Sequence, residues 1–476
     1  MTPLFALPAL LAGSAQPALP GDFVRALTFI PCGDANGDGV GDIAIGLPRD
    51  DAHGTDAGRV FILSGKDGSV IRELHEGGVR SGFGYAIAGN TDFDGDGKLD
   101  LAVAAHRDGF GDEVPAGQSE IPGRIYLYSL GTGTRIRTIE PTSASRLGVA
   151  YASALHVAGH LDGDKARDLL VEGRIEADVR GGYRSPLTLL AGPSGKILGE
   201  LPFDQEGAPF VLGDLTRSGG CVLALRDGPR FRFLTVRDQE PITQEPVAIG
   251  NLVARILVDL GDLDHDGISD IAAIGKSDTG AISEDVFAMS WAKREPLFLV
   301  RGEALRSAAR NEVSAQGTTL DACGAPDIDG DGRGELFVVL PGANRALTRE
   351  EWARQETKTA FPGSRMSGFA AMVSSKSGQW LWTTFGTAAE PLGMTMFDYG
   401  FGEEVRRIMD VDHDGLDDLG VSASYACTSE PYETAGASLR ILSSKDGSPL
   451  MWIEARPGAD PRVRVSKRVS GGSEPK

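Results

Sequence analysis

The sequence predicts an all-β protein: a seven-bladed β-propeller of four-stranded antiparallel blades with calcium-binding loops. Two observations lead to this prediction. A nine-residue acidic motif recurs seven times, beginning at residues 34, 92, 160, 214, 262, 327 and 410. Each copy stands in the same context, after one apolar segment and before another. Such periodic self-similarity is typical of repeat architectures, and four short strands per repeat are typical of a propeller blade.

The first two repeats show the expected strands in order. In the second repeat, the segments Phe83 to Gly89, Leu101 to Ala104 and Arg124 to Tyr128 are predicted as the first three strands. In the first repeat, the turn Ser64 to Gly68 leads into a fourth strand, because its glycines supply the positive φ that hairpin turns need. A flat solenoid is the alternative, but a four-stranded antiparallel unit closes radially more readily than it stacks.

The spacing of oxygen-bearing residues in the motif matches the coordination that calcium prefers. Calcium takes six to eight oxygen ligands in a loosely constrained geometry. A tight loop offers side-chain oxygens at positions 1, 3 and 5, a backbone carbonyl at position 7 and a carboxylate at position 9, and glycine at position 6 permits the sharp turn. Five intact loops provide the candidate ligands Asp34, Asn36, Asp38, Val40 and Asp42; Asp92, Asp94, Asp96, Lys98 and Asp100; Asp262, Asp264, Asp266, Ile268 and Asp270; Asp327, Asp329, Asp331, Arg333 and Glu335; and Asp410, Asp412, Asp414, Leu416 and Asp418.

Two copies of the motif are degraded. The third has His160 at position 1 and is expected to bind calcium weakly through the carboxylates that it keeps, Asp162, Asp164 and Asp168. The fourth loses its later ligands from Thr216 onward, so we expect it to bind no calcium. The prediction is therefore Ca²⁺ at about five sites, with a sixth, weak site.

The motif has two other interpretations. An EF-hand needs a glutamate at position 12, but Ile45 and Val103 hold that place inside predicted strands. An aspartate-rich turn without metal is the second alternative, stabilised by bonds from its side chains to its own backbone. Repetition of the pattern in five loops favours calcium, because repulsion among so many carboxylates would otherwise be costly.

The charge and composition exclude one class of partner. The formal net charge is −20, which argues against nucleic acid because phosphate binding requires a basic surface. The acidic loops account for the size of this charge. No stretch approaches the length of about 18 apolar residues that a membrane-spanning helix needs.

The strand and loop together resemble the FG-GAP repeat, which builds the propeller of integrin α subunits and of many bacterial extracellular proteins. The Phe-Gly pair stands at Phe83-Gly84 and Phe401-Gly402, and in altered form at Leu147-Gly148. The resemblance covers about Phe23 to Glu454. It implies a secreted, cell-surface or periplasmic protein that acts as a binding or adhesion scaffold, with structural calcium.

The chain ends lie outside the predicted propeller of residues 23–455. Residues 1–22 are interpreted as a signal peptide or a disordered extension, and residues 456–476 as a disordered tail. The cysteines Cys32, Cys221, Cys323 and Cys427 show no paired spacing, which leaves disulfides and buried free thiols both open. If strand one precedes Cys32, each blade is continuous in sequence, and Cys32 is expected near the seam between the first and last blades.

The predicted function is recognition of a protein or glycan partner, whose identity the sequence does not give. Long connections on a rigid scaffold usually carry recognition, and those between the second and third strands and between blades vary most in length. The candidate ligand-binding residues are Arg107, Phe110, Tyr183, Trp352, Tyr425 and Tyr432, with a helix expected over residues 346–357. For each residue, ordinary loop packing is the alternative.

A calcium-dependent polysaccharide-degrading enzyme, lyase or hydrolase, is the second functional hypothesis. Calcium propellers of related appearance occur in polysaccharide lyases. The sequence contains no H-E-x-x-H or G-x-S-x-G motif. The group around His106, Arg107 and Asp108 is the cluster to inspect for chemistry.

Overall fold

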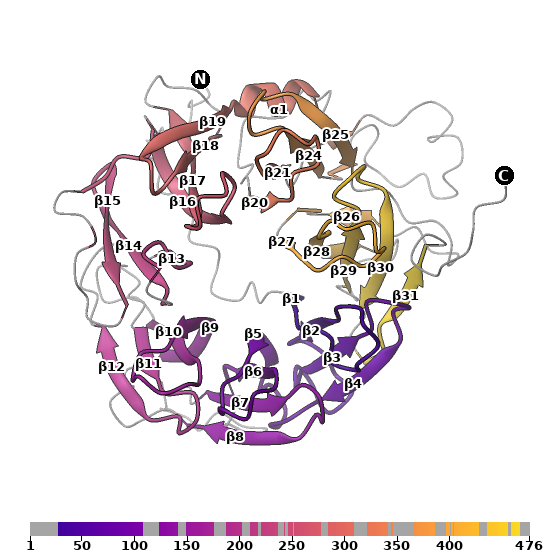
Figure 1. The fold of residues 1–476 in the computed structure, drawn as a ribbon. Helices are drawn as coiled ribbons and strands as arrows, with labels where there is room; N and C mark the ends of the chain where they lie inside the picture. Colours follow the sequence, from indigo (N-terminus) through magenta and orange to yellow (C-terminus); the bar gives the residue numbers. More distant parts are fainter. Residues whose placement is uncertain are drawn as a thin grey trace, which may run out of the picture.

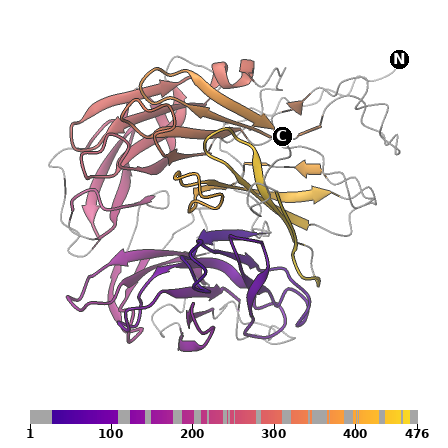
Figure 2. The same cartoon turned by 45° about the vertical axis from the view of Figure 1, so that its right-hand side comes forward.

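The computed structural model is a ring of seven blades around a central axis (Figures 1 and 2). It describes residues 27–107, 123–140, 149–175, 187–201, 210–217, 220–236, 242, 246–250, 252–277, 284–308, 321–340, 344–345, 365–366, 368–385, 397–399, 401–402, 404–427, 436–455 and 458–466. Every named strand pairing is antiparallel, so the predicted all-β propeller is confirmed.

The first three blades are four-stranded meanders in sequence order, with strand one innermost (Figure 1). Blade 1 holds β1 (Thr28–Pro31), β2 (Ile43–Leu47), β3 (Arg59–Leu63) and β4 (Val70–Leu74). Blade 2 holds β5 (Phe83–Thr91), β6 (Asp100–Ala105), β7 (Arg124–Ser129) and β8 (Arg135–Ile139). Blade 3 holds β9 (Val149–Gly159), β10 (Asp168–Ile175), β11 (Leu187–Leu190) and β12 (Ile197–Leu201).

Blade 4 is described over three strands and one isolated bridge. The strands are β13 (Phe210–Leu212), β14 (Val222–Asp227) and β15 (Arg230–Thr235). Among the described residues that follow β15, Val247 forms an isolated antiparallel bridge with Phe231.

Blades 5 and 6 again have four strands each. Blade 5 holds β16 (Leu252–Gly261), β17 (Asp270–Ser277), β18 (Glu284–Ser290) and β19 (Glu295–Val300), followed by the short helix α1 (Gly302–Ala308). Blade 6 holds β20 (Asp321–Ala325), β21 (Glu335–Leu340), β24 (Phe369–Val373) and β25 (Trp380–Phe385). A separate two-stranded ribbon pairs β22 (Asn344–Arg345) with β23 (Arg365–Met366).

Blade 7 has an additional outer strand. Its second strand β28 (Leu419–Cys427) pairs on its inner side with β26 (Phe397–Tyr399) and β27 (Val405–Arg407), and β29 (Gly436–Leu442) and β30 (Pro449–Ala455) follow. Outside them, β31 (Arg462–Val465) pairs with β30. The expectation of a disordered tail from residue 456 is therefore wrong for this segment, because the outer edge of β30 offers unpaired backbone groups that β31 fills.

Among the described residues, seven clusters of buried apolar side chains hold the ring together, one at each interface between neighbouring blades. At the seam between blades 7 and 1, Phe29 and Ile45 pack with Leu439 and Ile453, and the half-buried Val463 of β31 covers this cluster. Yellow β31 lies beside indigo blade 1 in Figure 1. Each blade is continuous in sequence, as expected.

The C-terminal segment also bonds directly to blade 1. Arg59, which is 3% exposed, donates to Asp460 Oδ1 at 2.9 Å and to the Ala459 carbonyl at 2.9 Å. The N–H of Gly458 donates to Asp50 Oδ2 at 3.2 Å. Residues 458–466, together with these bonds, thus close the ring where its two ends meet; we call this segment the C-terminal clasp.

The cysteine expectations are partly corrected. Cys32, Cys221 and Cys323 are buried free thiols, and burial raises the pKa of each. Cys32 packs with the interface of blades 1 and 2 and not at the seam with blade 7, because successive side chains of a strand alternate between its two faces. In the part of the chain that the structure describes, no helix is long and apolar enough to cross a membrane.

Candidate metal centres

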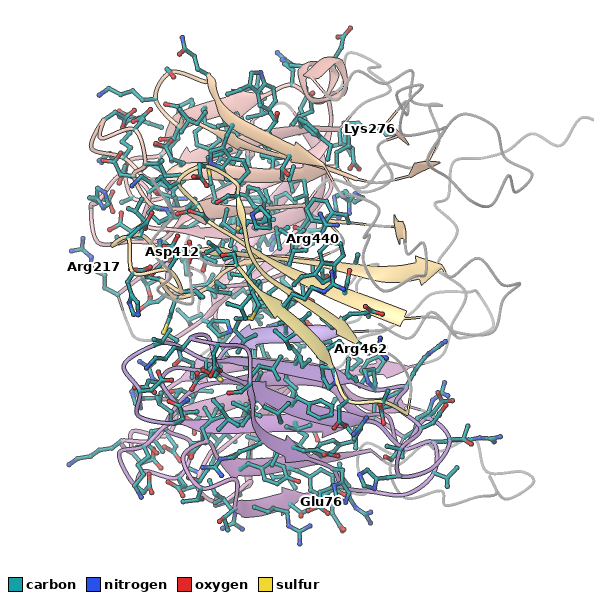
Figure 3. The ribbon with its side chains drawn as sticks, turned by 90° about the vertical axis from the view of Figure 1, so that its right-hand side faces the viewer. Glu76, Arg217, Lys276, Asp412, Arg440 and Arg462 are labelled. Atoms are coloured by element: carbon teal, nitrogen blue, oxygen red, sulfur yellow. The ribbon has the colours of Figure 1, made fainter. Side chains whose placement is uncertain are left out.

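The acidic motifs form loops between the first and second strands of the blades, on one face of the disc. We number these loops by blade. In Figure 3, Asp412 of loop 7 and Arg217 of loop 4 lie at this face, and Lys276 lies toward the opposite one. The turn between the third and fourth strands comes to the same face, as the meander predicts. Among the described residues, a backbone N–H of this turn donates to the position 9 carboxylate of the loop in five blades.

The position 1 aspartate folds each intact loop around itself. In loop 1, Asp34 accepts hydrogen bonds from the N–H groups of Gly37 at 2.7 Å, Asp38 at 3.0 Å and Gly39 at 2.8 Å. Asp327 of loop 6 repeats the pattern. Such a tight wrap needs positive φ, and Gly39 adopts 87°. The sequence folds this way locally because aspartate bonds readily to nearby backbone amides.

The position 9 carboxylate has a second role that the sequence analysis missed. In the six loops that keep this carboxylate, it has no exposed surface. In loop 1, Asp42 accepts from the Ala35 N–H at 2.7 Å with one oxygen and from the Gly65 N–H of the strand 3–4 turn at 3.1 Å with the other. The residue therefore cross-links the two connections of its blade. The recurrence of a small residue at the second turn position, at Gly65, Gly192, Ser375 and Ser444, is the signal that could have revealed it.

Burial makes the charge of these carboxylates costly. Burial, together with neighbouring loop aspartates, raises the pKa of Asp42, Asp100 and Asp270 to about 6. The same causes raise the pKa of Glu335 and of Asp418 to about 7. Backbone N–H donors oppose the shift without cancelling it. A site that concentrates unbalanced negative charge in this way favours a bound cation.

The loop carboxylates converge as a metal site requires. One oxygen from each of three side chains lies within 4.8 Å of the others in loops 2, 3, 5 and 6. Among the described residues, the buried oxygens Asp100 Oδ1, Asp264 Oδ1 and Glu335 Oε1 have no hydrogen-bond donor. Buried carboxylate oxygens that accept no hydrogen bond are suited to binding a hard divalent cation. The predicted ligand residues thus fit calcium.

The degraded loops differ in ways that their sequences explain. In loop 3, His160 Nδ1 lies 2.7 Å from the carbonyl oxygen of Ala166, which stands at position 7 of the motif. In loop 4, Asp214 accepts from both the N–H and the hydroxyl of Thr216. Arg217 of loop 4 extends to the backbone carbonyl of Asp266 in loop 5, so a side-chain cation from one blade reaches the loop of the next.

Lysines from the adjacent turns also reach the loops. Lys293 Nζ lies 2.7 Å from Asp264 Oδ2 and 3.7 Å from Asp266 Oδ2. Burial raises the pKa of Asp264, but its bonds to Lys293 and Ser290 outweigh this effect and lower the pKa overall. Lys376 donates to the Asp331 carbonyl at 3.0 Å, and Lys445 lies 3.8 Å from Asp414. Lys66 of blade 1 shares the turn position of Lys445, a recurrence that the sequence analysis passed over.

The predicted ligand-binding residues are only partly placed. Arg107 is half-buried at the end of β6, where its N–H donates to the Ser81 carbonyl at 3.0 Å. Tyr425 lies within β28 and pairs with Tyr399, so the expectation that it belongs to a loop is wrong. Phe110, Tyr183, Trp352, Tyr432 and the expected helix over residues 346–357 lie outside the described residues.

Of the three residues considered for catalysis, His106 is buried. His106 is 6% exposed, and its ring contacts that of Tyr85 in a tilted arrangement, with centroids 3.8 Å apart. Burial, reinforced by the neighbouring charge of Arg107, lowers the pKa of His106 to about 3, so its imidazole is neutral at physiological pH. Asp108 lies outside the described residues.

A central channel with a volume of about 990 Å³ runs between the first strands of the blades. Its lining includes the charged residues Asp321, Glu404, Arg406 and Arg407. Burial, together with the charge of Glu404, raises the pKa of Asp321 to about 6. The channel is thus a mixed-charge surface, without a single sign of potential.

Comparison with known proteins agrees with this architecture. Residues 83–128, which form most of blade 2, match the FG-GAP repeat. The chain is 41% identical to integrin alpha-PS2 of Drosophila melanogaster over 96 residues and 40% identical to human integrin alpha-6 over 78 residues. These matches cover 18% and 16% of this chain, but only 7% and 6% of the integrins. The repeat, the relatives and the seven blades together define an integrin-α-like FG-GAP propeller.

Among solved structures, the Dos1 propeller aligns with 86% of this chain and 76% of its own length. Its sequence identity is 12% and the TM-score is 0.41, values that carry no argument about function.

Proposed function

We propose that this chain is an extracellular propeller that calcium stabilises and that serves as a scaffold for binding another protein. The observation that carries the proposal is the repeated convergence of loop carboxylates, several with buried oxygens that no donor satisfies. Loops 1, 2, 5, 6 and 7 would each hold one calcium ion, loop 3 would bind more weakly, and loop 4 would bind none.

Calcium would act on stability and not on chemistry. Extracellular calcium modules bind at roughly 10⁻⁴ to 10⁻³ M, so about 1 mM calcium contributes about 0.4 to 1.4 kcal/mol per site. Five sites contribute roughly 2 to 7 kcal/mol, a large part of the stability of an ordinary domain. By balancing the position 9 carboxylates, the ion would hold the loop and the strand 3–4 turn of each blade together.

The choice of a protein as the proposed partner rests on the resemblance of this chain to integrin α. The similarity to integrin α supports a protein partner, and the net charge of −20 disfavours nucleic acid. The buried, neutral His106 does not support the polysaccharide-degrading alternative, because a catalytic acid or base must reach its substrate.

The experiment that tests the proposal separates binding from cleavage. The protein is incubated with immobilised extracellular-matrix proteins and with acidic and neutral polysaccharides, in calcium and in EDTA. We expect calcium-dependent retention on a protein surface and intact polysaccharide chains. Retention on a polysaccharide alone would indicate a glycan partner in place of a protein. Cleavage of the polysaccharide would support the enzyme hypothesis and contradict the scaffold proposal.

A further inference from the structure

A second kind of metal-binding chemistry lies on blade 1, in a cluster that contains histidine. His53 belongs to the connection between β2 and β3, Glu73 lies in β4, and His75 follows β4 by one residue. The two residues near β4 are two positions apart and therefore share one face of the strand. His53 Nε2 lies 3.3 Å from Glu73 Oε1, and the imidazole rings of His53 and His75 stack with centroids 3.7 Å apart.

The distances suit a shared metal ion. One ligand atom from each of the three side chains lies within 4.8 Å of the other two. Two ligand atoms on a tetrahedral zinc ion, at bond lengths of about 2.0 to 2.2 Å, are about 3.4 Å apart. The separation of 3.3 Å between His53 Nε2 and Glu73 Oε1 already matches that value. Convergence of the nitrogen lone pairs on one ion requires the two imidazole rings to turn out of their stacked arrangement.

The ligand set selects the class of metal. Imidazole nitrogen suits zinc, copper and nickel, whereas calcium prefers an all-oxygen shell. Two histidines and a carboxylate are a zinc ligand set that leaves a fourth position for water. The side chains of His53 and Glu73 are 39% and 36% exposed, so an ion can enter from solvent.

The surroundings hold the carboxylate and supply negative charge. Glu73 Oε1 accepts a hydrogen bond from Arg59 Nη1 at 3.1 Å. Arg59 also donates two hydrogen bonds to the carboxylate of Asp50, at 2.7 and 2.9 Å. Asp460 of the C-terminal clasp bonds to the same guanidinium. One arginine against the carboxylates of Asp50, Glu73 and Asp460 leaves a local charge of −2, which a divalent cation balances. Hydrogen bonds to a ligating carboxylate orient it for the metal.

We propose that His53, Glu73 and His75 form a binding site for a divalent transition metal, with zinc as the type ion. The site is separate from the acidic loops in its ligands and in its place on the blade. Through Glu73 and Arg59 it connects the β2–β3 connection to the segment that closes the ring. Bound zinc therefore stabilises blade 1 at the point where the clasp docks.

The test is calorimetric titration of the full chain with zinc chloride, without a polyhistidine tag and in excess calcium, so that the acidic loops are occupied by their preferred ion. We expect one zinc equivalent for the unmodified protein. His53→Gln and His75→Gln should each weaken binding by about tenfold or more, as loss of one ligand predicts. Glu76→Gln removes the carboxylate next to His75 in sequence, outside the cluster, and should bind zinc normally (Glu76 is labelled in Figure 3).

Two results would overturn the proposal: no zinc binding by the unmodified protein, or unchanged zinc binding in both histidine variants. Because these side chains lie at the surface, the variants should keep the melting temperature of the unmodified protein in calcium without zinc. A zinc-dependent rise in melting temperature that the histidine variants lose would confirm the link to the seam. None of these readouts depends on a protein or glycan partner.

Discussion

Gly65 tests the cross-link between the acidic loop and the strand 3–4 turn. A Cβ atom at Gly65 would lie 1.9 Å from the Gly41 carbonyl oxygen, well inside any normal contact distance. Gly65→Ala therefore forces turn and loop apart by about 1 Å or more, since core contacts begin near 3 Å. The hydrogen bond from Gly65 N–H to Asp42 Oδ1, 3.1 Å long, then breaks.

The cost follows from the burial of Asp42, which has no exposed surface. Loss of a hydrogen bond to a buried charged group costs about 1.5 to 3 kcal/mol. Movement of the turn adds to this cost, so we expect the free energy of unfolding to fall by about 2 to 4 kcal/mol. Urea unfolding in calcium, followed by tryptophan fluorescence, measures the change.

Blade 7 provides the matched control. Ser444 holds the equivalent turn position, and its N–H donates to Asp418. Because a Cβ is already accommodated there, Ser444→Ala should change stability by less than about 0.5 kcal/mol. Equal stability of the Gly65→Ala variant and the unmodified protein would refute the cross-link.

Three further predictions concern the loops, the channel and the clasp. Lys293→Met removes the ammonium group that lies 2.7 Å from Asp264. The calcium affinity measured by calorimetry should therefore rise, and the melting temperature in EDTA should fall. No change in either quantity would show that the lysine does not compete with calcium. The folded pKa of Asp321, about 6, exceeds its unfolded value, so the stability it contributes is present at low pH and is lost as pH rises from about 4 to 6. Asp321→Asn should abolish that loss, about 1 to 3 kcal/mol in urea titrations at pH 4 and 7, and an unchanged pH profile would contradict the assignment. Truncation after residue 455 removes β31 and leaves Arg59 with fewer hydrogen-bond partners, so the free energy of unfolding measured in urea should fall by about 2 to 4 kcal/mol. Truncation after residue 466 is the control and should change this free energy little.

The repeat structure was predictable from the sequence because each motif specifies its own loop. Four or five oxygen-bearing residues at alternate positions, with glycine at position 6, determine the local fold whatever lies elsewhere in the chain. The strands that flank the motif, such as β2 and β6, follow from short apolar runs. Each blade carries one motif between its first and second strands, which is why the count of motifs equals the count of blades.

Contacts between distant segments could not be predicted in the same way. The clasp depends on Asp460 meeting Arg59, and the histidine cluster brings a loop residue, His53, to the edge of β4. Neither pairing leaves a periodic pattern in the sequence.

Calcium binding is the central claim, and one measurement tests it most directly. The metal-free protein is titrated with calcium in a calorimeter, and its thermal unfolding is recorded in calcium and in EDTA. We predict about five calcium equivalents, a weaker sixth, and a melting temperature that is many degrees lower in EDTA. No heat of calcium binding, together with an identical melt in EDTA, would contradict the account and leave the acidic loops as turns stabilised by their own backbone bonds.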